Sequence, residues 1–95
     1  MYFKFGVDSF IWAEKFSEKD LWIIPKAKEL GFEVIDFAIA DPFSFPVKAV
    51  KEKLEEVGID CVCTTTLTAE TNPISPDPEI RKNAAEAMNK CVDIC

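Results

Sequence analysis

The chain has 95 residues, of which 48% are apolar and 29% are charged, and its formal net charge is −6. This composition is typical of a single folded globular domain and excludes a disordered segment. The acidic balance argues against a nucleic-acid partner, which would need clustered Lys and Arg, and no apolar run approaches the roughly 20 residues of a membrane span.

The expected elements alternate between strand and helix from the first residues onward. An apolar strand at 3–8 precedes a helix at 19–30, in which Pro25 is tolerated early or produces a kink. A second apolar strand follows at 33–39.

The second helix is expected at 45–57. Ser44 is its expected N-cap, and Pro46 falls in the first turn, where its missing N–H does little harm. Apolar residues recur at steps of three and four to form one stripe, which consists of Val47, Val50, Leu54 and Val57.

A third strand at 59–65 leads to a helix at 76–95. Either Ser75 or Asp77 caps this helix, and a Pro follows each of them. The apolar face of the helix is formed by Ile80, Ala84, Met88, Cys91 and Cys95.

A repeated pattern links these elements. Residues 29–36 and 56–63 share the end of a helix, a Gly and an apolar strand that begins with an acidic residue. Gly31 and Gly58 supply the left-handed position that ends a helix. Residues 4–8 lie the same interval earlier and form another apolar strand, so three matches in register indicate a repeating unit.

This alternation predicts an α/β fold with a parallel sheet and right-handed crossovers. Three parallel strands alone would leave unpaired edges, whereas eight such units approach the size of a (β/α)8 TIM barrel, about 250 residues. We therefore expect residues 1–95 to be the N-terminal part of a single TIM-barrel domain, truncated after three β/α units. The long loops after the first and third strands, at 9–18 and 66–76, are where such folds carry ligands.

Four cysteines occur as two pairs, Cys61 with Cys63 and Cys91 with Cys95. Each pair points to one face of its own element, as small packed apolar residues do. A zinc site is the alternative, although these spacings are not those of the usual zinc knuckles. No signal peptide is evident at the start of the chain, and we expect a cytoplasmic protein.

Several segments resemble one family, and the resemblance spans essentially the whole chain. They are GVDSFIW at 6–12, AKELGFEVID at 27–36, SPDPEIR at 75–81 and CVDIC at 91–95. Together they are similar to the N-terminal part of the sugar isomerase/epimerase superfamily with the xylose-isomerase-like TIM barrel. Within it, the D-tagatose and D-allulose (psicose) 3-epimerases are the most similar.

The resemblance implies that the full-length protein is an isomerase that epimerises C3 of a free ketohexose through an enediolate. It implies a divalent metal, often Mn²⁺, that polarises the sugar, and two glutamates that move the proton. In the family these glutamates and the metal ligands come from later strands. No catalytic or metal-binding residue is therefore assigned to this chain, which would supply scaffold and one wall of a ketose pocket. A homo-oligomer is also compatible with the resemblance.

Two aromatic residues are expected to form that wall. Trp12 matches a tryptophan in the family's loop after the first strand, and Phe16 falls where a second aromatic residue usually lies. An aromatic wall packs against a sugar face and excludes water. The alternative for Trp12 is simple packing at the top of the barrel.

Polar residues at the strand ends complete the expected substrate contacts. Asp8 stands where the family more often has an aromatic residue, and it either contacts the sugar or remains a hydrated cap of the loop. Thr64 and Thr66 are expected to face inward and bond a sugar oxygen, although strand propensity alone also favours Thr. Asp36 either positions groups at the pocket floor or forms an ion pair with a residue of a strand that this chain lacks.

The sequence is also compatible with other functions. Within the same superfamily, the alternatives are another sugar or sugar-phosphate isomerase, a hydroxypyruvate isomerase or an inosose dehydratase. The DNA-acting relatives of endonuclease IV fit poorly, since the chain has no His and no basic surface. The alternative outside the enzymes is a non-catalytic fragment, or a binding module that uses its open strand edge.

Overall fold

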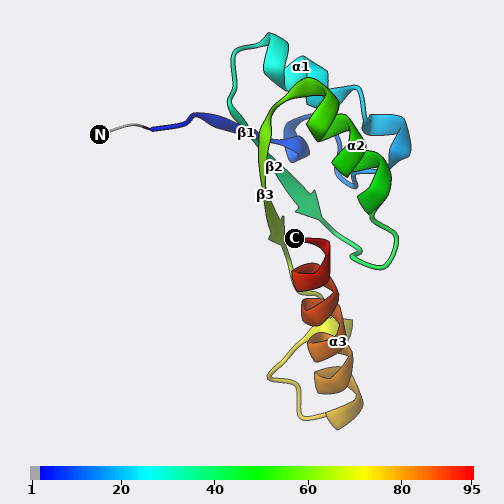
Figure 1. Ribbon diagram of the computed structural model, residues 1–95. Coiled ribbons are helices and arrows are strands. Elements are labelled where there is room, and N and C mark those ends of the chain that lie inside the picture. Colours follow the sequence, from blue (N-terminus) through cyan, green and yellow to red (C-terminus); the bar gives the residue numbers. More distant parts are fainter. Residues whose placement is uncertain (1–2) are drawn as a thin grey trace.

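The computed structural model describes residues 3–95, and three strands form one parallel sheet in the order β1–β2–β3 (Figure 1). The strands are β1 at Gly6–Asp8, β2 at Val34–Ile39 and β3 at Asp60–Thr65. Strand β1 is shorter than the expected 3–8, although the Phe5 carbonyl still accepts a hydrogen bond from the Glu33 N–H at 2.9 Å. The parallel α/β architecture predicted from the repeat is therefore present.

In the described part of the chain one α-helix follows each strand, and there are also three short 3-10 helices. The α-helices are α1 at Ile23–Glu29, α2 at Val47–Val57 and α3 at Pro78–Ile94, and the 3-10 helices are Ser9–Ile11, Glu18–Asp20 and Ala69–Thr71. None of the helices in the described part of the chain is both long and apolar enough to cross a membrane.

Helix α1 begins later than the expected 19–30, because a separate capped turn precedes it. The Asp20 carboxylate accepts hydrogen bonds from the Ser17 N–H at 3.0 Å and the Ser17 hydroxyl at 3.2 Å. This closes the turn at Glu18–Asp20 before the α-helix starts. Pro25 then lies in the first turn of α1, where its missing N–H is harmless.

The prediction that Ser44 is the N-cap of α2 is wrong. Pro46 occupies the cap position, and the Ser44 hydroxyl donates to the Asp41 carboxylate at 3.0 Å instead. The same carboxylate accepts from the Phe43 N–H at 3.0 Å, so a local turn centred on Asp41 competes for Ser44. The helix ends at Gly58, whose φ of 75° is the left-handed conformation expected from the sequence.

Of the two N-caps expected for α3, Ser75 and Asp77, the structure has Asp77. Asp77 is the N-cap and accepts a hydrogen bond from the Glu79 N–H at 2.9 Å, while Pro78 occupies the first helical position. The Ser75 hydroxyl accepts from the Asp77 N–H at 3.1 Å and so shapes the approach to the helix. Asp77 is therefore the cap.

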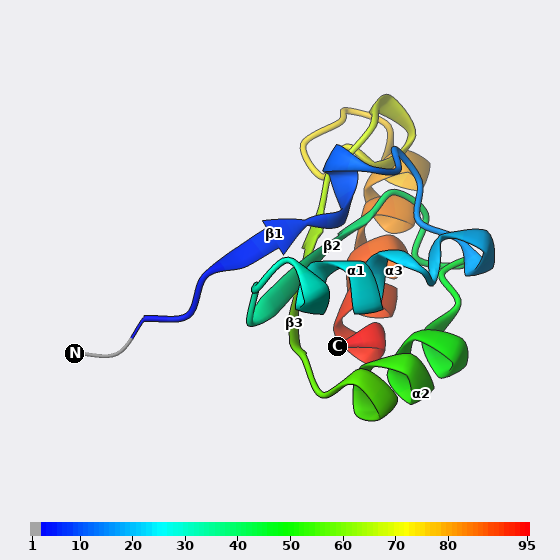
Figure 2. The same ribbon diagram turned by 90° about the horizontal axis from the view of Figure 1, so that it is seen from above.

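The hydrophobic core lies on one face of the sheet, which α1 and α2 cover together (Figures 1 and 2). Alternate residues of β2 are buried, so every second side chain enters this core. The buried core cluster consists of Phe16, Ile23, Ile24, Ala27, Ile35, Phe37, Ile39, Val50 and Ile59. The face that carries Asp36 and Val62 is left open to solvent in this chain, and Val62 is exposed.

The apolar stripes of α2 and α3 contact the rest of the protein differently. In α2, Val50 is buried while Leu54 and Val57 pack against the core, as the stripe predicts. In α3, Met88 and Cys95 of the expected face are exposed, whereas Ala84 and Ala87 are buried. Figure 1 shows why: α3 projects beyond the carboxyl ends of the strands, and only its C-terminal end lies beside the sheet.

Candidate functional site

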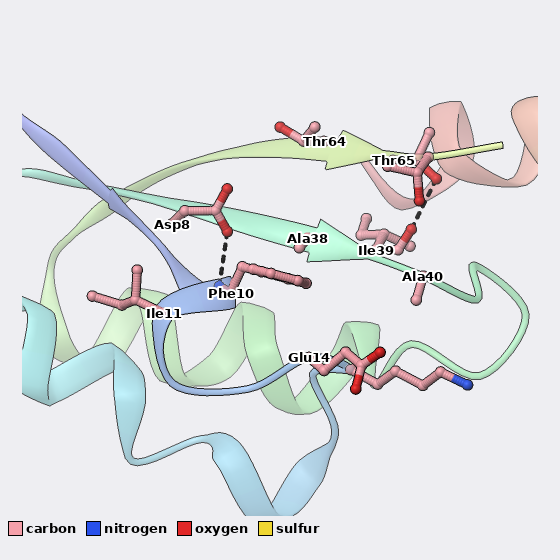
Figure 3. A pocket seen from close by; sticks show the side chains of 11 residues that line it. Asp8, Phe10, Ile11, Glu14, Ala38, Ile39, Ala40, Thr64 and Thr65 are labelled. Carbon is pink, nitrogen blue, oxygen red and sulfur yellow. Dashed lines mark hydrogen bonds between the residues drawn. The ribbon is translucent and has the colours of Figure 1, made fainter.

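The carboxyl ends of all three strands and the loop after β1 surround an open pocket of about 460 Å³ (Figure 3). In parallel α/β folds this end of the sheet is where ligands bind. The lining residues are Asp8, Phe10, Ile11, Glu14, Lys15, Ala38, Ile39, Ala40, Thr64, Thr65 and Thr66.

Asp8 ends β1 and holds the following turn in place. Its Oδ1 accepts a hydrogen bond from the Phe10 N–H at 2.8 Å. Figure 3 shows the second carboxylate oxygen turned away from that bond. Among the described residues no protein group donates to this Oδ2, so one oxygen of the carboxylate is available to a ligand.

Asp36 and Thr64 form a pair on the open face of the sheet, on neighbouring strands. The Thr64 hydroxyl lies 2.8 Å from one carboxylate oxygen of Asp36 and 2.9 Å from the other. Asp8 is the register partner of Asp36 in the β1–β2 pairing, so the two residues are neighbours on adjacent strands. The inward orientation expected for Thr64 therefore places it against Asp36.

The other two threonines of this run differ in how they are bonded. The Thr65 hydroxyl donates to the Ile39 carbonyl at 2.8 Å and so belongs to the strand pairing. Thr66 lies just beyond β3, is exposed, and lines both this pocket and the adjoining hollow near Leu67. Thr66 is thus the threonine whose hydroxyl is most accessible to a ligand.

Ser9 is a buried polar residue that the sequence did not single out. It is fully buried, and its hydroxyl accepts a hydrogen bond from the Ala38 N–H at 3.1 Å. Its carbonyl accepts from the N–H groups of Trp12 and Ala13, both at 3.0 Å. Ser9 therefore fixes the loop after β1 against the end of β2, and the signal for it was a hydroxyl directly after an apolar strand.

The two aromatic residues expected in the wall, Trp12 and Phe16, do not line this pocket. Phe16 is only 7% exposed and packs edge-on against Phe37, with ring centroids 5.0 Å apart. Trp12 is half-buried, packs against the core and meets Trp22 edge-on at 6.2 Å. The structure thus brings together Asp8, Thr64 and Thr66 but places Phe16 in the core.

Phe10 and Ile11 supply the apolar part of the pocket instead. Their side chains are 60% and 66% exposed, so they present apolar surface to the pocket. Glu14 and Lys15 line both this pocket and a smaller hollow that Trp12 borders, so Trp12 lies at the rim. In the sequence, the signal for this surface was two adjacent large apolar residues just after the first strand.

The charged groups near the pocket do not form a metal site. Within residues 3–95, no three His, Cys, Asp or Glu side chains are placed to hold a metal ion together. The described residues therefore do not fit the divalent metal that the family resemblance implies.

The shifted pKa values lie away from the pocket. A hydrogen bond from Lys4, reinforced by its charge, lowers the pKa of Asp60 at the start of β3. Burial raises the pKa of Cys63 to about 12.

No family model matches the chain. Among curated proteins, it is 32% identical over 92 residues to a ketose 3-epimerase from Arthrobacter globiformis, which covers 96% of the chain and 32% of that protein. It is also 32% identical over 85 residues to a D-psicose 3-epimerase from Ruminiclostridium cellulolyticum, which covers 85% of the chain and 29% of that protein. The chain thus spans about a third of the length of these relatives.

Solved structures agree with these relatives. A Methylomonas sp. D-allulose 3-epimerase in complex with D-allulose matches with a TM-score of 0.89 and 26% identity, covering 96% of the chain and 32% of that protein. An L-ribulose 3-epimerase matches in fold with a TM-score of 0.83 at 19% identity. The prediction that the chain has the fold of one portion of a larger TIM barrel is confirmed.

Proposed function

Because the chain is homologous to ketose 3-epimerases over nearly its whole length, we propose that the full-length protein containing it epimerises C3 of an unphosphorylated ketose. The observation that supports this most strongly is the 32% identity to the Arthrobacter globiformis ketose 3-epimerase across 96% of the chain. The pocket at the carboxyl ends of β1–β3 has the position that such a barrel uses for its substrate. This chain contributes scaffold and one wall of that site.

In this proposal the polar contacts to the sugar come from Asp8 and Thr66. The Oδ2 of Asp8 accepts a hydrogen bond from a sugar hydroxyl, since its other oxygen is already held by the Phe10 N–H. The Thr66 hydroxyl either donates to a sugar oxygen or accepts from one. Thr64 acts indirectly, because it holds Asp36.

The apolar side of the sugar is met by Phe10 and Ile11. Aromatic and aliphatic surface of this kind excludes water from a sugar ring or chain. Trp12 stays in the proposal as a contact at the rim, beside Glu14 and Lys15. Phe16 supports the site from within the core, through its packing on Phe37.

Epimerisation at C3 requires removal of a proton next to a carbonyl and its return to the opposite face. We assign neither proton transfer to a residue of this chain. A divalent metal, Mn²⁺ by the family resemblance, would polarise the ketose, and its ligands are proposed to be residues other than those described. A cytoplasmic location is also a prediction from the sequence.

A ketopentose is the second candidate substrate. Two of the relatives are L-ribulose 3-epimerases, from Mesorhizobium japonicum and a Methylomonas strain, at 21% and 26% identity. The pocket residues of this chain suit either sugar, because hydroxyls of both ketoses present the same donors and acceptors.

The test is an assay of the purified full-length protein on D-allulose, D-fructose, D-tagatose and L-ribulose, each with Mn²⁺ and with excess chelator. Formation of the C3 epimer of at least one sugar, lost with chelator, supports the proposal. Interconversion of aldose and ketose without any C3 epimer would favour another isomerase of the same superfamily instead. Absence of activity on all four sugars with Mn²⁺ present would contradict the proposal.

A further inference from the structure

The Ser9 hydroxyl bonds to β2 at a point where β1 has already ended. Strand β1 stops at Asp8, which is the register partner of Asp36, so Ala38 lies two residues beyond the end of the β1–β2 pairing. Without a β1 residue opposite it, the Ala38 N–H needs another acceptor, because a partly buried N–H is costly to leave unpaired. The Ser9 hydroxyl accepts a hydrogen bond from this N–H at 3.1 Å.

The backbone of Ser9 holds the loop that follows. Its carbonyl accepts hydrogen bonds from the N–H groups of Trp12 and Ala13, both at 3.0 Å. Ser9 itself is fully buried. One residue therefore joins the loop after β1 to the end of β2, its carbonyl through the loop and its hydroxyl through the strand.

Both segments that Ser9 joins belong to the pocket, although Ser9 is not among the residues that line it. Phe10 and Ile11 follow Ser9 directly and form the apolar side of the pocket. Ala38 lines the pocket from β2, together with the two residues after it (Figure 3). The position of the apolar side relative to the end of β2 therefore depends on the hydrogen bond that the Ser9 hydroxyl accepts.

We propose that Ser9 is a positioning residue for the epimerisation, because its hydrogen bond to the Ala38 N–H fixes the distance between Phe10 and Ile11 on one side and the end of β2 on the other. This inference rests on the proposed function. Ser9 acts through these residues and does not touch the sugar. A reaction that depends on the orientation of its substrate can lose about 100-fold in rate when the groups that hold the substrate move by roughly 1 Å.

A merely structural role for Ser9 predicts a different result. The hydroxyl would then contribute only to the free energy of unfolding, and every folded molecule of a variant would react as fast as the wild type. Val50→Ala is the matched control, because Val50 is buried in the core on α2 and does not line the pocket. This variant loses stability without changing the segments that Ser9 joins.

The test compares Ser9→Ala, Ser9→Thr and Val50→Ala in the full-length protein. Steady-state kinetics use the ketose that the wild type epimerises fastest, at a temperature where circular dichroism shows that each variant is folded. Ser9→Ala is expected to lower kcat on the order of 10- to 100-fold, with a smaller change in KM, since the sugar still binds but in a wider range of positions. Ser9→Thr keeps the hydroxyl and is expected to recover most of the loss, whereas Val50→Ala is expected to match the wild type in kcat and KM.

Hydrogen exchange links the kinetic effect to the bond. In Ser9→Ala the Ala38 amide is expected to exchange faster than in the wild type, because its acceptor is gone. In Val50→Ala no selective change at Ala38 is expected. A loss of kcat in Ser9→Ala with an Ala38 amide as protected as in the wild type would overturn the proposal.

The failure of this inference differs from the failure of the proposed function. An active wild type with the same kcat in Ser9→Ala would overturn the role of Ser9 alone, as would an equal loss of kcat in Ser9→Ala and Val50→Ala. A wild type that epimerises no ketose would overturn the proposed function, and the role of Ser9 with it. Should Ser9→Ala fail to fold, Ser9→Cys takes its place, because a thiol of similar size is a weaker acceptor and is expected to lower kcat in the same direction.

Discussion

The Thr64 hydroxyl bridges β3 and β2 by donating to the Asp36 carboxylate, whose oxygens lie 2.8 and 2.9 Å away. A Thr64→Val substitution keeps the shape of the side chain but removes the donor. We expect it to lower the free energy of unfolding by about 1 kcal/mol, the usual net value of such a bond. Urea unfolding of the 95-residue chain measures the change. Thr64→Ser retains the hydroxyl and is expected to recover most of the loss; equal losses in both variants would contradict this role.

Variants of Asp8 in the full-length protein distinguish its proposed contact with the sugar from its hydrogen bond to the following loop. Asp8→Asn keeps an oxygen that accepts from the Phe10 N–H but removes the negative charge. We expect this variant to retain the fold and to raise KM for the ketose, because a carboxylate accepts a stronger hydrogen bond than an amide. Steady-state kinetics measure the effect, and Asp8→Ala is expected to raise KM further. An unchanged KM in both variants would exclude a sugar contact.

Phe10 and Phe37 are both aromatic, but they have opposite roles. Phe37 is 1% exposed in the core, and Phe37→Ala is expected to cost about 3–5 kcal/mol of stability. Phe10 is 60% exposed, and Phe10→Ala is expected to change stability by less than about 0.5 kcal/mol while raising KM for the ketose. Urea unfolding and sugar kinetics on the full-length protein distinguish the two. A large stability loss in Phe10→Ala would show that it packs more tightly than described.

The ion pair between Lys4 and Asp60 predicts a pH dependence. Lys4 lowers the pKa of Asp60 from its ordinary value of 3.8, first through a hydrogen bond and then through its charge. A carboxyl whose pKa is lower in the folded state stabilises that state above its unfolded pKa. The pair's contribution is therefore present above pH 3.8 and is lost as the pH falls through the folded pKa.

Nuclear magnetic resonance titration of the Asp60 carboxyl checks this directly. In Lys4→Met the titration midpoint is expected to rise toward 3.8. Added salt is expected to move the wild-type midpoint in the same direction, because both partners are largely exposed. A wild-type midpoint already at 3.8 would contradict the pairing.

The cap of α3 provides a local test of stability. Asp77→Ala removes the acceptor of the Glu79 N–H and is expected to cost about 1 kcal/mol. Asp77→Asn keeps a side-chain oxygen and is expected to cost much less. Urea unfolding followed by circular dichroism at helical wavelengths measures both; equal costs would place the effect in the charge of Asp77 rather than in the hydrogen bond.

The helix ends set by a single residue could be predicted from the sequence. Gly58 ends α2 in the left-handed conformation, and Asp77 caps α3. Ser44 could not be placed from the sequence, because Asp41 competes for its hydroxyl through a local turn. The face of α3 was partly mispredicted because most of this helix projects beyond the strands, so only its last turn meets the core.

The residues of the candidate site could be predicted where the alternation of side chains along a strand, or a place at its end, sets their position. Asp8 and Thr64 follow from their places at strand ends, and Thr66 follows from its place just after one. Phe16 was expected in the pocket, but its burial against Phe37 depends on how the loop after β1 folds over the sheet.

The central claim, that this chain is part of a ketose 3-epimerase, is tested most directly by incubating the full-length protein with a ketose in D₂O. Removal and return of the C3 proton predicts the C3 epimer and deuterium at C3, both visible by nuclear magnetic resonance. Deuterium at C1, with an aldose as the product, would contradict the claim. A ketose recovered unchanged and without deuterium at C3 would contradict it as well.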